Sequence, residues 1–184
     1  MAIRIWFRFE VEALAAARRR YRHAQENPDV YPWAVTHSGD PNPAAELWEH
    51  ALVAEVQISN DGRTLFRRTG SHEGEGDVNV GWVLFGLLHA VSAARTERQV
   101  MLFAPDYQEI WVEIGASDEL CVSTSSETSI CAPREEWLRS LDRALAELRT
   151  VLNAEMPELA HDQFLSNWLS GGQPPLFVNL VGSP

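Results

Sequence analysis

The segment from residue 100 to residue 152 constrains the fold of this 184-residue chain more than any other. Three short apolar runs, at 100–103, 110–114 and 120–124, are separated by turn residues and predict a meander of strands. Pro133 then stands where a helix can begin, because a first helical turn tolerates proline. An amphipathic stripe follows it, made of Trp137, Leu138, Leu141, Leu145, Leu148 and Leu152. This order predicts an α+β fold with an antiparallel sheet.

The N-terminal half predicts further elements of the same domain. Apolar and polar residues alternate over 3–11, which predicts a strand, and the alanine- and arginine-rich run 13–24 favours a helix. Strand-like runs at 52–58 and 64–68 flank Ser59-Asn60-Asp61-Gly62, and an Asp-Gly turn with positive φ indicates a hairpin. Residues 78–94 are apolar almost all round, so we expect a helix buried on every side.

One domain accounts for nearly the whole chain. We expect a sheet built from the N-terminal strand, the hairpin and the three-strand meander, packed against two main helices. A short last helix is expected over 157–169, ending at Gly171-Gly172. Residues 1–172 then form a single α+β domain, and 173–184 form a C-terminal tail that either docks as an edge strand or stays loose. The pattern does not define the strand order or the oligomeric state.

The charge of the chain limits its partners. The sequence holds 26 Asp and Glu against 15 basic residues, all of them arginine, and its formal net charge is −11. A field of this sign repels nucleic acid and anionic membranes and favours a basic protein partner. The sequence has no apolar run long enough for a membrane span and no signal-peptide pattern. We therefore expect a cytoplasmic protein in which Cys121 and Cys131 are reduced thiols.

The meander offers a candidate binding surface. Strand alternation places Glu109, Trp111 and Glu113 on one face and Ile110, Val112 and Ile114 on the other. The second set belongs to the core, so the first forms an acidic, aromatic face, to which Asp106 and Tyr107 of the preceding turn are added. A large aromatic side chain among charges is typical of a recognition surface, although a plain solvated strand face is the alternative.

A second candidate is a metal site in the glycine-rich loop after the hairpin. His72, Glu73 and Asp77 bring an imidazole and two carboxylates within six residues, and such groups bind divalent cations. The spacing matches no known set of ligands, and Asp77 is also suited to cap the helix that follows. A solvated loop is the interpretation we favour, and we expect no cofactor.

Other reactive residues form only fragments of catalytic arrangements. His89 near Ser92 and the pair His161-Asp162 suggest a nucleophile and a base, but no Gly-x-Ser-x-Gly elbow accompanies Ser92. We expect His89 to be a buried core histidine. The sequence contains no glycine-rich phosphate loop, dinucleotide fingerprint, zinc spacing or basic recognition helix.

The layout resembles the small acidic immunity proteins that bacteria encode beside polymorphic or contact-dependent toxins. The resemblance rests on size, charge, the order hairpin, helix, meander and helix, and the lack of catalytic motifs, with 82–91 and 99–124 as its most recognisable stretches. It implies a non-enzymatic protein that covers a basic toxin surface. The alternatives are a metal-assisted hydrolase that uses the His72, Glu73 and Asp77 loop, and a scaffold or accessory domain.

Overall fold

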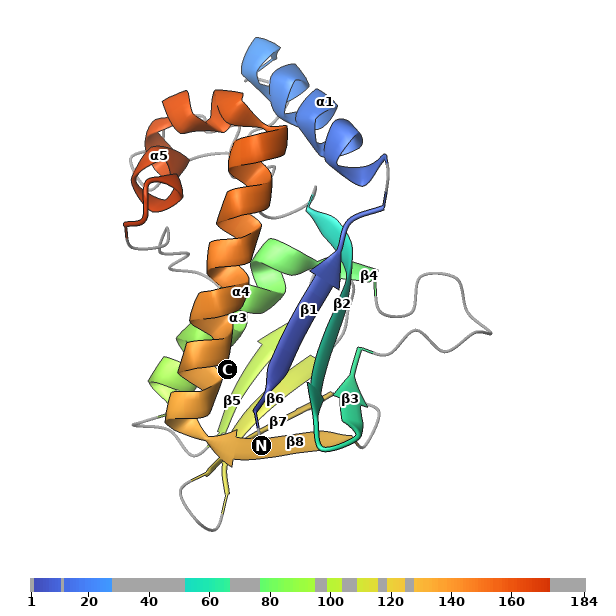
Figure 1. The fold of residues 1–184 in the computed structure, drawn as a ribbon, viewed down its shortest axis with the longest axis vertical. Helices are drawn as coiled ribbons and strands as arrows, with labels where there is room; N and C mark the ends of the chain where they lie inside the picture. Colours follow the sequence, from blue (N-terminus) through green and yellow to red (C-terminus); the bar gives the residue numbers. More distant parts are fainter. Residues whose placement is uncertain are drawn as a thin grey trace.

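The computed structural model describes residues 2–10, 12–27, 52–66, 77–94, 99–103, 109–115, 119–124 and 128–172. The elements in these ranges are eight strands, four α-helices and one 3-10 helix. Figure 1 shows their arrangement. The strands are β1 (Arg4–Arg8), β2 (Val53–Asn60), β3 (Arg63–Leu65), β4 (Asp77–Asn79), β5 (Gln99–Phe103), β6 (Glu109–Ile114), β7 (Glu119–Thr124) and β8 (Ser129–Pro133). The helices are α1 (Ala13–Glu26), α3 (Val80–Ala93), α4 (Arg134–Glu155), the 3-10 helix η3 (Pro157–His161) and α5 (Gln163–Leu169).

The first sheet is built around β2. Strand β1 pairs with one edge of β2, while β3 and β4 pair with successive parts of the other edge, all antiparallel. Asp61 and Gly62 join β2 to β3 with φ values of 50° and 80°, so the predicted Asp-Gly hairpin is confirmed. Glycine adopts such a φ at no steric cost, which fixes the turn at this position.

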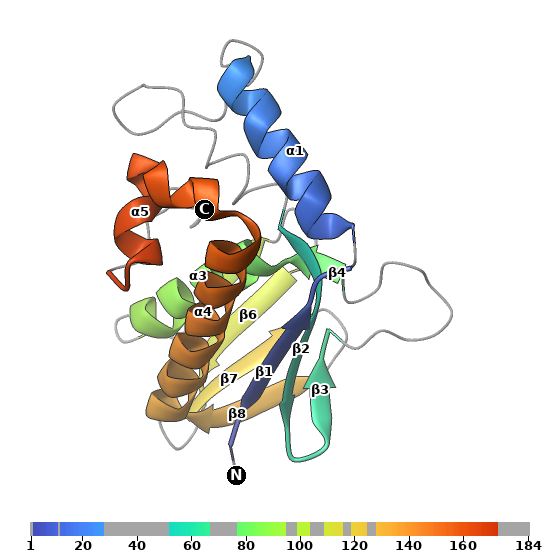
Figure 2. The same cartoon turned by 45° about the horizontal axis from the view of Figure 1, so that its top comes forward.

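The second sheet is a meander in chain order, β5-β6-β7-β8. Its apolar side chains alternate, and the buried ones face the helices: Ile110, Val112, Leu120, Val122, Ile130 and Ala132. The two sheets meet where β3 lies beside β8, and a guanidinium nitrogen of Arg63 there donates to the carbonyl oxygen of Ser129 at 3.1 Å. Together they curve around α3 and α4 (Figure 2).

Helix α3 lies at the centre of the core, as its sequence predicts. Ten of its fourteen residues are buried, because it packs against α4 and against both sheets. Its N-cap is Asn79, whose side-chain oxygen accepts a hydrogen bond from the backbone N–H of Trp82 at 2.8 Å. The cap satisfies one of the free amides of the first turn. None of the described helices is long and apolar enough to cross a membrane.

Helix α4 joins the two sheets through buried hydrogen bonds. The indole N–H of Trp137 donates to the carbonyl oxygen of Leu120 in β7 at 2.9 Å. One turn later, the Ser140 hydroxyl donates to the carbonyl oxygen of Ile3, beside β1, at 2.9 Å. The amide of Ile3 in turn donates to a carboxylate oxygen of Glu136 at 2.6 Å. A single helix face therefore sets the position of both sheets.

Helix α1 is held against the segment that follows α4. Arg18 and Arg22 place their Nε atoms 2.5 and 3.5 Å from Oε1 of Glu158. The hydroxyl of the buried Tyr21 donates to Asp162 at 3.1 Å. Partial burial opposes ionisation of Glu158, but the hydrogen bond from Arg18 and the positive charges of both arginines outweigh it and lower its pKa. Burial and the nearby carboxylates of Asp162 and Glu158 raise the pKa of Tyr21, so its hydroxyl stays protonated.

The α+β class is confirmed, and four details differ from expectation. The strands form two four-stranded sheets instead of one, and β4 and β8 were not foreseen. Asp77 belongs to β4 and does not cap α3, because two further residues stay extended before the helix begins. The last helix is split at Asp162 into η3 and α5. The expected tail, residues 173–184, lies outside the described residues.

The hydrogen bond between Trp137 and Leu120 predicts a large effect of a small substitution. Trp137→Phe keeps an aromatic ring but removes the buried hydrogen bond from the indole N–H to Leu120 and opens a void. We expect a loss of about 2–3 kcal/mol in the free energy of unfolding, measured by urea denaturation. Trp6→Phe is the matched control, since Trp6 is 41% exposed. Equal stabilities of the two variants would contradict this account of α4.

The pKa of Glu158 predicts how the docking of α1 depends on pH. A carboxylate whose pKa is lowered in the folded protein stabilises it above the ordinary glutamate pKa, and this contribution disappears as the pH falls through the lowered value. Because Glu158 is partly exposed, we expect Glu158→Gln to cost about 1 kcal/mol at pH 7. Denaturation at pH 7 and near pH 3 measures it. A difference between variant and wild type that persists at the acidic pH would exclude the ion pairs as its source.

Candidate binding surface

Glu109, Trp111 and Glu113 lie on the side of the second sheet that faces away from the helices. In β6, Ile110 and Val112 are buried, whereas Glu109 and Trp111 are half-buried and Glu113 is exposed. The same alternation continues across the next two strands. We call this side the outer face and define it by Glu109, Trp111, Glu113, Glu119, Cys121, Ser123, Ser129 and Cys131.

Strand register places Trp111 between Met101 of β5 and Ser123 of β7. Ser123 is in turn opposite Ser129 in β8. The next row along the strands consists of Glu113, Cys121 and Cys131. The indole is the bulkiest group that β6, β7 and β8 contribute to the outer face, it is half-buried, and its neighbour on the β7 side is a serine.

The outer face is acidic because its strands supply carboxylates and no cation. Glu109 and Glu113 come from β6 and Glu119 from β7, while these two strands and β8 contain no arginine or lysine. Sequence reasoning placed Glu119 in a turn and missed it as part of this face. The period-two pattern of Glu119, Cys121 and Ser123 was the signal that the strand begins earlier.

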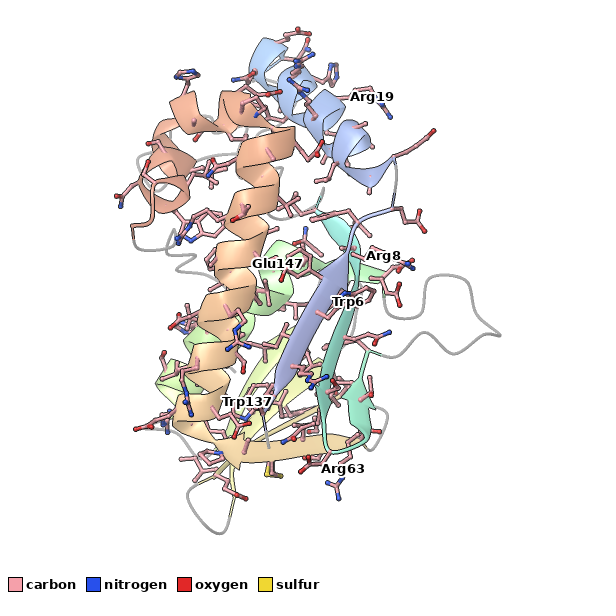
Figure 3. All side chains as sticks on the ribbon, in the orientation of Figure 1. Trp6, Arg8, Arg19, Arg63, Trp137 and Glu147 are labelled. Atoms are coloured by element: carbon pink, nitrogen blue, oxygen red, sulfur yellow. A yellow bond between two sulfur atoms is a disulfide. The ribbon has the colours of Figure 1, made fainter. Side chains whose placement is uncertain are left out.

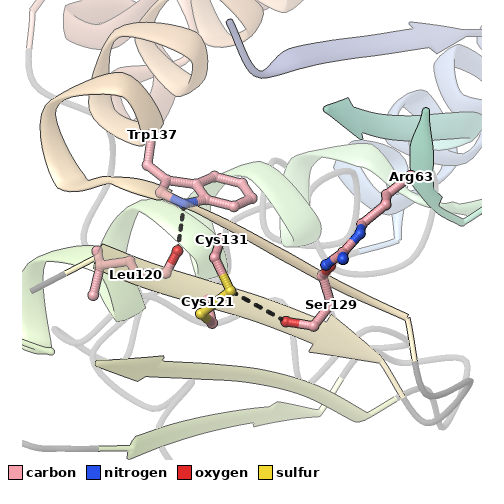
Figure 4. Close-up of a disulfide and its surroundings, with 6 residues drawn as sticks. All are labelled: Arg63, Leu120, Cys121, Ser129, Cys131 and Trp137. Atoms are coloured by element: carbon pink, nitrogen blue, oxygen red, sulfur yellow. Dashed lines mark hydrogen bonds between the residues drawn. A yellow bond between two sulfur atoms is a disulfide. The ribbon is translucent and has the colours of Figure 1, made fainter. Parts of the chain in front are cut away.

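A disulfide ties the outer face together, so the expectation of two reduced thiols is wrong. Cys121 and Cys131 are opposite each other in β7 and β8 and are bonded, with their Cα atoms 4.0 Å apart. The hydroxyl of Ser129 lies 3.7 Å from Sγ of Cys131 (Figure 4). The pairing was missed because β8 was not foreseen, and without β8 nothing places Cys131 opposite Cys121. On the opposite side of this hairpin, Trp137 binds Leu120.

The structure describes only some of the other predicted site residues. Asp106 and Tyr107, expected beside the outer face, lie outside the described residues, as do His72 and Glu73 of the candidate metal loop. Asp77 is in β4 opposite Glu55, and Glu55 is 7% exposed and accepts a hydrogen bond from Arg8 at 2.9 Å. Within the described ranges, no group of three His, Cys, Asp or Glu side chains is arranged to hold a metal ion.

The histidine fragments do not form a catalytic arrangement in the described part of the chain. His89 is exposed on α3, so its expected place in the core is wrong. It lies on the outward side of a helix that is otherwise mostly buried. The Ser92 hydroxyl donates to the carbonyl oxygen of Leu88 within the same helix. His161 is exposed at the end of η3, while its neighbour Asp162 accepts the bond from Tyr21.

Comparisons with known proteins found no match for this chain. No protein-family model, no curated protein and no solved structure matches this chain. The chemistry of the outer face therefore rests on its own residues. They provide a half-buried indole, three carboxylates and a cross-linked pair of strands.

The disulfide predicts a measurable part of the stability of this sheet. It closes a loop between residues ten apart in the sequence, and a short closed loop restricts the unfolded chain by about 2–3 kcal/mol. We expect the double variant Cys121→Ser with Cys131→Ser to lose about that amount, measured by urea denaturation without reductant. Dithiothreitol should destabilise the wild type equally and leave the double variant unchanged. A wild-type midpoint that reductant does not move would show that the bond contributes nothing.

Proposed function

We propose that this protein is a non-enzymatic binding protein whose outer face docks on a basic protein partner. The observation that carries the proposal is the composition of that face: Glu109 and Glu113 flank an indole on β6, Glu119 adds a carboxylate on β7, and β6, β7 and β8 supply no cation. Carboxylates of one sign attract a cationic surface and speed its approach.

Trp111 supplies the apolar contact of such an interface. Tryptophan is among the residues whose removal most weakens protein complexes, especially where neighbouring residues keep water away. Trp111 is half-buried at its base and stands between Glu109 and Glu113 on the same strand face. An indole with carboxylates on both sides also suits arginine, because a guanidinium stacks on the ring while it pairs with a carboxylate.

The finer form of this proposal is an immunity factor that covers the basic surface of a bacterial toxin domain. The net charge of −11 and the acidic outer face support it, because a toxin that acts on nucleic acid is itself basic. If a gene adjacent to that of this protein encodes a large exported protein with a toxic C-terminal domain, the two products should co-purify. A scaffold role predicts a stable partner of another kind.

A metal-assisted hydrolase that uses His72, Glu73 and Asp77 is the competing function. Asp77 is opposite the carboxylate of Glu55 across β2 and β4, so two acidic residues are neighbours there. Metal analysis of the purified protein separates the two functions. Stoichiometric zinc or manganese that is lost in His72→Ala would overturn the binding proposal.

A pull-down with paired variants tests the outer face. The protein is immobilised and exposed to a lysate of its source organism, and retained proteins are identified by mass spectrometry at low and high salt. We expect a basic partner whose retention falls with salt and falls at least tenfold in Trp111→Ala with Glu113→Gln, since a central indole and its charge contribute about 2 kcal/mol or more.

The control variant removes one carboxylate and one indole from surfaces other than the outer face. Glu147→Gln on the exposed side of α4, combined with Trp6→Ala on β1, removes the same types of group from other surfaces (Figure 3). This control variant should retain the partner like the wild type. A partner that responds equally to both double variants, or one that is itself acidic, would refute the assignment of the outer face.

A further inference from the structure

A groove with its own set of polar groups is lined by residues of α3, α4 and α5. Figure 2 shows where these three helices lie. Its volume is about 450 Å³, which is in the range of small-molecule sites. The polar residues that line it are Ser92 from α3 and Asp142 and Arg149 from α4, and its apolar lining includes Leu88, Leu145 and Trp168.

Arg149 is positioned in this groove without an acceptor. Its guanidinium lies 5.1 Å from the ring centroid of Trp168, which is buried and therefore holds it in place. The Nε atom is itself buried and has no hydrogen-bond partner, and the described part of the chain provides no ion pair for this residue. A half-buried guanidinium that stacks on an indole, and whose Nε has no acceptor among the described residues, is suited to bind a planar oxyanion.

Asp142 marks the other end of the groove. It lies on the same face of α4 as Leu145 and Arg149, seven residues before Arg149, which corresponds to about 10 Å along the helix. The described residues place no cation against its carboxylate, and Ser92 uses its hydroxyl proton on Leu88. The groove thus has a positive end and a negative end with the apolar Leu145 between them.

We propose that this groove binds a small elongated zwitterion. Its carboxylate meets the guanidinium of Arg149, its ammonium meets the carboxylate of Asp142, and its methylene chain lies against Leu88 and Leu145. The two protein charges are two helical turns apart, so the charged groups of the ligand must be farther apart than those of an α-amino acid. A dianion is disfavoured because its second charge would face Asp142.

Calorimetric titration with three matched probes tests this proposal. 6-Aminohexanoate carries both charges, hexanoate lacks the ammonium, and hexylammonium lacks the carboxylate. We expect the wild-type protein to bind 6-aminohexanoate roughly fivefold or more tightly than either single-charge probe, since each partly exposed ion pair contributes about 1 kcal/mol.

Two variants assign the two ends of the groove. Arg149→Met keeps a stem on Trp168 and should lose binding of both carboxylates, while Asp142→Asn should remove only the advantage of 6-aminohexanoate over hexanoate. Asp142 is exposed, so its variant folds even if Arg149→Met does not. Arg143→Met, on the same helix but outside the groove, and Trp111→Ala on the outer face should bind like the wild type. Equal affinity for 6-aminohexanoate and hexanoate, or no binding of either, would overturn the proposal.

Discussion

The fold depends on the buried hydrogen bonds that one face of α4 makes to two different sheets. Trp137 and Ser140 donate to the backbone carbonyls of Leu120 and Ile3, which belong to segments far apart in the sequence. Both bonds are buried, so water cannot replace either donor when it is lost. Hydrophobic contact alone allows α4 to slide or rotate, whereas these two bonds define its register on both sheets. The position of α3 follows, because α3 packs between α4 and the strands.

This arrangement assigns a different role to each side of the second sheet. The buried side chains against α3 and α4 are apolar, and every charge that β6 and β7 carry is on the outer face. The disulfide between Cys121 and Cys131 then links two neighbouring strands on that face. A rigid surface loses less conformational freedom on association than a loose one. The same packing that builds the core therefore also prepares the outer face for binding.

Residues with strong local signals allowed much of the fold to be predicted, and residues whose role depends on distant partners did not. Asp61-Gly62 defines its hairpin because the turn requires positive φ, and the apolar α3 has no surface to expose. The alternation in β6 placed Glu109, Trp111 and Glu113 on one face by periodicity alone. By contrast, β8 ends at Pro133 and is a strand only because β7 pairs with it, so both the strand and the disulfide escaped prediction. Asp77 and Asn79 are both good helix caps by residue type, and pairing of β4 with β2 selects Asn79.

The groove between α3, α4 and α5 shows that the apolar stripe of a helix does not predict the surroundings of every residue on that helix. Leu145, Leu148 and Leu152 form the predicted apolar stripe of α4, and each is buried. Arg149 is adjacent to Leu148 and would be taken from the sequence for a solvated residue. The end of α5 changes the environment of Arg149, because Trp168 reaches the side of α4 and stacks on the guanidinium. The paired arginines of α1 and Arg149 of α4 therefore have different surroundings. Arg18 and Arg22 of α1 are paired with Glu158, whereas Arg149 is held on an aromatic ring and its Nε has no acceptor among the described residues.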